Sequence, residues 1–224
     1  MLFRSSAAYG HGEYVSPDIL VQEFGSLYAT GLGNEVYVLA NSIDSFGDIY
    51  ATDYGKLLIE GATFGGPMDP YALNDGELTL QDCQVFGAVA QANGTVRLVR
   101  TNVTDTLDVR ASGHAHVQDG TGSVSTATVA GTGMLRVHDD GWLSLGDATC
   151  DGVMLIEGSA MSTGTWSQGT NGFGVAVLSN GELQGNFINN LPLQGSGRIH
   201  ANMLTQNGDM TVNGGAMEMT QNAY

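Results

Sequence analysis

A glycine followed by apolar residues two and four positions later recurs through this chain from residue 25 onward. The pattern begins at Gly25, Gly47, Gly55, Gly76, Gly94, Gly113, Gly133, Gly141, Gly152, Gly197, Gly208 and Gly215. The glycines at positions 55, 76, 94, 113, 133, 152 and 172 follow one another at intervals of 18 to 21 residues. A nearly constant period of about 20 residues indicates a solenoid, in which each repeat packs on its neighbours.

Within a repeat, the apolar residues alternate with polar ones, which is the period of a β-strand. In 77–81, Leu78 and Leu80 are expected to point inward and the three residues around them outward. No stretch after residue 25 keeps the spacing of an amphipathic helix. We therefore predict an all-β fold, a parallel right-handed β-helix solenoid with about ten coils of 18–22 residues.

An ordinary series of hairpins is the alternative, because Asn-Gly pairs between alternating runs also signal hairpin turns. Two observations favour the solenoid. The period is nearly constant, and Leu58-Ile-Glu-Gly61 returns as Leu155-Ile-Glu-Gly158, 97 residues later. We expect the glycines to lie at corners that need a positive φ or a close approach of two backbones.

The repeat suggests two parts, a cap or anchor segment at 1–24 and a β-helix at 25–224. Residues 1–24 do not follow the pattern but contain enough apolar side chains to cover the first coil. The last repeat stays strand-like to Thr220, so we expect other subunits to cover it, most simply in a trimer. Two interruptions, 65–70 and 189–195, are expected to be loops.

Charge excludes several functions. The chain has 23 acidic and 7 basic residues, for a net charge of −16. Such a surface repels phosphate backbones and anionic membranes, so we expect no nucleic-acid partner. No apolar run approaches the length of a membrane span, so we expect no membrane insertion. Cys83 and Cys150 stand at different positions of their repeats, which predicts two buried thiols rather than a disulfide.

The most enzyme-like cluster is His138-Asp139-Asp140. Paired carboxylates can hydrolyse a glycosidic bond, but Asp-Asp before Gly141 is also ordinary corner chemistry. Gly10-His11-Gly12 is similar to a short motif of polygalacturonase-type enzymes, whose partner aspartate and arginine-lysine motifs are missing here.

Other side chains suggest binding. His114 and His116 are expected to face outward together, but no third metal ligand is identifiable. Trp142 and Trp166 could offer stacking surfaces for sugars, and Tyr28 and Tyr50 occupy equivalent positions and are expected to stack on each other. The sequons Asn93-Gly-Thr95 and Asn102-Val-Thr104 are also ordinary corners. We predict no catalytic, cofactor-binding or metal-binding residue, no cofactor, and no enzyme activity.

The repeated glycine words, the acidic surface and the Asn/Gly corners over 25–219 resemble β-helical surface proteins. Two groups share these features: bacteriophage fibre, spike or head-decoration proteins, and bacterial autotransporter-type passengers. The resemblance implies a structural or adhesive virion component that projects its β-helix from the particle and docks to other virion proteins through residues 1–24. It also implies a trimer and a host-surface glycan as partner. The alternatives are a polysaccharide lyase or glycosidase of the β-helix class and an adhesin secreted to the cell surface.

Overall fold

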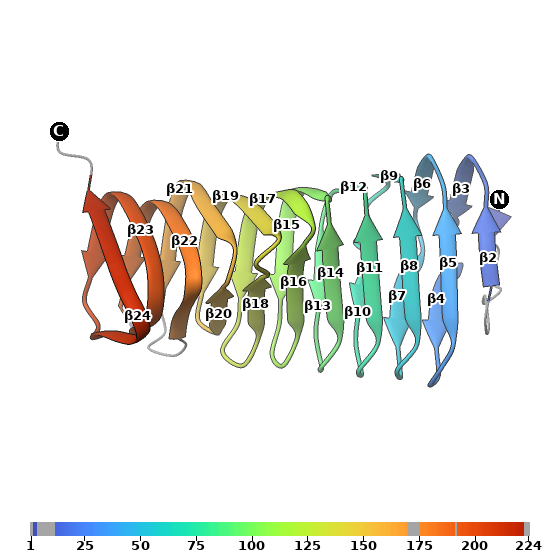
Figure 1. The fold of residues 1–224 in the computed structure, drawn as a ribbon. Helices are drawn as coiled ribbons and strands as arrows, with labels where there is room; N and C mark the ends of the chain where they lie inside the picture. Colours follow the sequence, from blue (N-terminus) through green and yellow to red (C-terminus); the bar gives the residue numbers. More distant parts are fainter. Residues whose placement is uncertain (1, 4–11, 170–174, 191, 222–224) are drawn as a thin grey trace.

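The computed structural model describes residues 2–3, 12–169, 175–190 and 192–221. In these ranges every regular element is a β-strand, and none is a helix that could cross a membrane. Equivalent strands of neighbouring coils pair in parallel, which builds a rod-shaped β-solenoid of about ten turns, drawn from blue to red in Figure 1. The predicted all-β parallel solenoid is confirmed, while the hand of its winding stays a prediction.

Each coil contributes three strand segments, which stack into three faces of the rod. The first face holds β2 (Gly12–Val15), β5 (Glu35–Leu39), β8 (Lys56–Glu60), β11 (Glu77–Gln81), β14 (Thr95–Val99), β16 (His114–Gln118), β18 (Met134–Val137) and β20 (Val153–Ile156). The second holds β1 (Leu2–Phe3), β3 (Asp18–Val21), β6 (Ser42–Ser45), β9 (Thr63–Gly65) and β12 (Gln84–Val85). The third holds β4 (Ser26–Thr30), β7 (Asp48–Thr52), β10 (Tyr71–Ala72) and β13 (Ala88–Ala90).

Later strands are longer because they continue around a corner. Four strands bend from the second face onto the third: β15 (Asn102–Val109), β17 (Gly120–Val129), β19 (Gly141–Cys150) and β21 (Ser159–Gln168). Three more run through more than one face: β22 (Val175–Asn189), β23 (Leu193–Gln206) and β24 (Met210–Gln221). On the first face, the register from Glu35 to Val175 advances by 18 to 22 residues per coil, as predicted.

The interior of the rod is a continuous apolar core. Leu78 and Leu80 are fully buried, while Glu77, Thr79 and Gln81 between them are partly exposed. The same alternation holds from β4 to β20, so the inward and outward assignment read from the glycine words is confirmed there. In the last coil the pattern loosens, and Val212 and Met219 are 50% and 46% exposed.

The corner glycines are needed because two backbones meet there. A Cβ placed on Gly94 would lie 2.2 Å from the carbonyl carbon of Ala72, and one on Gly76 would lie 2.3 Å from that of Ala51. Neither glycine has a positive φ. The positive φ angles occur instead in the residues before these glycines, such as Ala92 (48°) and Asn93 (64°). Of the two expected reasons for glycine, close approach is therefore the one that applies at these two corners.

The close approach aligns a row of hydrogen bonds along the rod. The amides of Glu77, Thr95 and His114 donate to the carbonyl oxygens of Gly55, Gly76 and Gly94, each at 2.9 Å. Met134 and Val153 continue the row at the same distance, to Gly113 and Gly133. These five glycines, at 55, 76, 94, 113 and 133, thus each accept a bond from the residue that follows the corner glycine of the next coil. This bond fixes the distance between coils.

The described part of the predicted cap segment pairs with the coil that follows it. Strand β2 pairs in parallel with β5, and β3 pairs with β6, so a coil already exists before Gly25. Ile19 and Val21 point inward as in later repeats, but no glycine precedes them at the repeat spacing, so the glycine pattern did not reveal this coil. Residues 4–11, including Gly10 and His11, lie outside the described residues. Residues 66–70 form the expected loop. The loop predicted at 189–195 is shorter than expected: Asn190 and Pro192 lie outside strands, but Asn189 ends β22 and β23 already begins at Leu193.

We predict that Gly94→Ala lowers the free energy of unfolding by about 3 kcal/mol, because its methyl group would overlap the backbone of Ala72. Gly131→Ala is the matched control, since a Cβ at Gly131 meets nothing within 4 Å. Urea denaturation followed by circular dichroism measures both. Equal stability of the two variants would show that the corner does not need glycine.

Candidate functional site

The third face carries a stack of three tyrosines. Tyr28 and Tyr50 lie with ring centroids 5.0 Å apart and planes 3° apart, and Tyr71 continues the stack at 5.1 Å and 7°. The predicted pairing of Tyr28 with Tyr50 is confirmed and extends by one ring. Because the ring faces contact one another, the tyrosines present edges to solvent rather than faces on which a sugar could stack. Burial and the charge of Asp48 raise the pKa of Tyr71 to about 12.

The first face brings two histidines together across one coil. Nδ1 of His116 lies 2.9 Å from Nε2 of His138, so one ring donates a hydrogen bond and the other accepts it. Burial, with the nearby charge of Arg97, lowers the pKa of His116 to about 4. Burial and Arg136 also lower the pKa of His138. The pair is therefore neutral near pH 7.

His114 and His116 both point outward from β16, as predicted. His116 is hydrogen-bonded to His138, whereas Nδ1 of His114 is buried without a hydrogen-bond partner. Across the described ranges, no three histidine, cysteine or acidic side chains are placed to hold a metal ion. Cys83 and Cys150 are free and buried, as predicted, and burial raises their pKa values to about 11 and about 12.

Asp139 and Asp140 form a turn at a corner of the coil, which is the ordinary role that Asp-Asp-Gly suggested. The amide of Gly141 donates to the carbonyl of His138 at 2.8 Å and closes the turn. Asp139 lines an open groove of about 600 Å³ at the edge between the first and second faces, whereas Asp140 does not. We call this the carboxylate groove; Glu157, Glu182, Glu218 and Arg198 also line it.

The charges around this groove are largely neutralised. The guanidinium of Arg136 binds Glu157 through two hydrogen bonds of 2.7 and 2.8 Å, which lower the pKa of that carboxyl. Every arginine and lysine whose side chain is described has a carboxylate partner: Lys56 with Glu35, Arg97 with Glu77, Arg100 with Asp82 and Asp119, Arg110 with Asp108, Arg136 with Glu157, and Arg198 with Glu218. These cations are not free to hold an acidic substrate.

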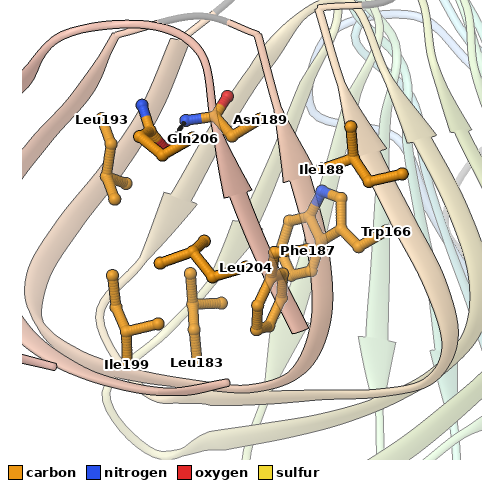
Figure 2. Close-up of a pocket in the computed structure, with 9 residues that line it drawn as sticks. All are labelled: Trp166, Leu183, Phe187, Ile188, Asn189, Leu193, Ile199, Leu204 and Gln206. Atoms are coloured by element: carbon orange, nitrogen blue, oxygen red, sulfur yellow. Dashed lines mark hydrogen bonds between the residues drawn. The ribbon is translucent and has the colours of Figure 1, made fainter. Parts of the chain in front are cut away.

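Trp166 is not a surface residue, contrary to expectation. It is 3% exposed and packs on Phe187 inside the rod, with ring centroids 5.4 Å apart. Figure 2 shows it with Leu183, Leu204 and other side chains around a cavity of about 20 Å³, which has room for about one water molecule. Trp142 is 38% exposed and remains available for contact.

A line of exposed apolar residues was missed by the sequence analysis. Phe24, Phe46, Met68 and Phe86 lie at the corner between the second and third faces in successive coils and are 88%, 52%, 39% and 53% exposed. We call these four residues the aromatic edge. Phe-Gly pairs recur at 24, 46 and 86, but Phe64-Gly65 is the same pair with Phe64 buried, so the pair alone does not reveal this line. Asp69 lies at the same corner, and burial together with Asp105 raises its pKa.

Comparison of the chain with protein-family models, curated proteins and solved structures returns no match. The fold and its surfaces therefore carry the functional argument.

We predict that His116 reduces stability under mildly acidic conditions. Its pKa falls from about 6.5 in the unfolded chain to about 4 in the folded one, so the unfolded state binds more protons between these values. Stability from this residue is complete above about pH 6.5 and falls as the pH drops toward 4. His116→Gln should flatten this part of the profile. An NMR titration midpoint of His116 at or above 6.5 would contradict the prediction.

Proposed function

We propose that the chain is a structural and adhesive component of a bacteriophage particle, a head-decoration, spike or fibre protein whose β-helix projects from the surface. The observation that carries this proposal is the aromatic edge. Four large apolar side chains exposed along successive coils cost solvation free energy without contributing to the core, and such lines mark interaction surfaces. A rod with such an edge is suited to adhesion.

Charge narrows the partners of this rod. The net charge of −16 and the pairing of the described cations disfavour nucleic acid and acidic polysaccharide. The solenoid also supports a structural role, because its inter-coil hydrogen bonds and continuous core make one stiff body. We propose a glycan or another neutral or cationic host-surface group as the receptor, and other virion proteins as partners of residues 1–17, the part of the predicted anchor segment that precedes β3.

We further propose that the rods associate as a trimer. The support is the last two coils, where Met203 of β23 and Val212 and Met219 of β24 are 45%, 50% and 46% exposed. Burying these side chains between subunits would remove apolar surface from water and protect the edge of β24 from unspecific pairing.

Glycan hydrolysis is a second candidate, favoured by the carboxylate groove. Its four acidic side chains could supply an acid and a base. Glu157 is the least suited as the acid, because Arg136 holds it ionised. Hydrolysis of a capsular polysaccharide that is lost in Asp139→Asn and Glu182→Gln but kept in Asp140→Asn would favour this enzyme.

Mass spectrometry of density-purified particles tests the main proposal. We expect the chain in the particle fraction, and light scattering of the purified protein should give three times its mass of 23.4 kDa. Recovery only from the cytosol would overturn the virion role, and recovery from the cell surface alone would favour a bacterial adhesin. A monomer at micromolar concentration would contradict the trimer.

A further inference from the structure

The aromatic edge contains a groove at its N-terminal end. Leu20, Gln22, Glu23, Phe24 and Phe46 line a depression of about 450 Å³. Leu20 points outward from β3, and the two phenylalanines come from the corners of consecutive coils. Such a volume suits a small ligand or a group carried by a larger one.

Phe24 has an unfavourable conformation. The amide of Gly25 donates to the carbonyl of Gln22 at 2.8 Å, which closes a turn with Phe24 at its third position. The φ of Phe24 is 65°, a value that glycine or asparagine adopts at that position and that is rare for a bulky residue. Its ring is also 88% exposed. Phenylalanine here therefore weakens both the turn and the solvation of the fold, and its ring stands at the wall of the groove.

The electrostatics of the groove favour a cation. Glu23 lines it and is the only charged residue that does so. None of the arginine and lysine side chains in the described ranges lines it. Phenyl rings add a negative electrostatic face but no hydrogen-bond donor. An anion would find no cationic partner here, whereas a methylated ammonium group would find rings for its methyl groups and the carboxylate of Glu23 for its charge.

We propose that the groove between Phe24 and Phe46 binds a quaternary ammonium group of the choline type. The proposal rests on the adhesive role proposed above and names the chemistry of the receptor. Phe24 and Phe46 contact the cation through their rings, Leu20 packs against its methyl groups, and Glu23 supplies the opposite charge. The affinity of one such shallow site is expected on the order of 1 mM.

Titration of the full chain with choline, followed by NMR, tests the ligand. The control ligand is 3,3-dimethylbutan-1-ol, which has the same shape without the charge. We expect choline to shift the resonances of Leu20, Phe24 and Phe46 saturably, and the alcohol to bind at least about fivefold more weakly. Equal binding of the two ligands, or binding of neither, would overturn the proposal, as would a glucose oligomer that binds in their place.

The variant Phe24→Gly gives a test with opposite signs. It should weaken choline binding at least about fivefold and raise the midpoint of thermal unfolding, because glycine fits the positive φ. Tyr54→Gly is the matched control, since Tyr54 has a φ of 66° and is 57% exposed at another corner. It should gain stability but keep choline binding. Unchanged choline binding in Phe24→Gly would overturn the site.

Two further results separate this inference from the proposed function. Choline binding by a chain that is found only in cytosol would keep the site and remove the virion role. Adhesion of particles that depends on Phe46 and Phe86 but is unaffected by choline would keep the adhesive role and overturn the ligand.

Discussion

The close contact between successive backbones at the glycine corners is the constraint on which the rest of the structure depends. Gly94 can lie against Ala72 only because it lacks a Cβ. Because the backbones are that close, the amide of the residue after each corner glycine donates a hydrogen bond of 2.9 Å to the carbonyl of the corner glycine in the preceding coil. The repeated contact brings equivalent residues into register, and the inward residues of neighbouring coils then form one core.

The same register organises the surface. Residues far apart in sequence become neighbours at the spacing of adjacent parallel strands, so each outward column is a row of potential contacts. Tyr28, Tyr50 and Tyr71 form a stack in one column. Arg136 reaches Glu157, and His116 reaches His138, diagonally into the neighbouring column, because their register partners are Leu155 and Arg136. The surface of this protein is thus determined by the column in which a residue falls, and the aromatic edge follows the same rule at a corner.

The pattern of a glycine followed by alternate apolar residues predicted which side chains face the core, because alternation within a strand depends only on neighbouring residues. Leu78 and Leu80 needed no further information. Contacts across coils could be predicted only where two repeats have nearly the same sequence, as around Tyr28 and Tyr50. The His116–His138 contact could not, because coil lengths vary from 18 to 22 residues and a shift of one residue reverses the faces.

Two other features escaped for related reasons. Residues 12–21 form a coil without a glycine word, so the repeat could not reveal it. Phe24 and Phe46 interrupt no pattern, since corners have no periodicity, and only their exposure in the folded rod distinguishes them from core residues. Trp166 was misplaced because the long strand β21 turns a corner, which changes the side that alternate residues face.

Distances between spin labels along the first face test the parallel in-register stack most directly. Glu35, His114 and Val153 occupy one column, with four coils from Glu35 to His114 and six from Glu35 to Val153. With the buried cysteines replaced, labels on these residues should lie about 19 Å and about 29 Å apart, which is about 4.8 Å per coil. Distances that do not rise in proportion to the number of coils would contradict the stack.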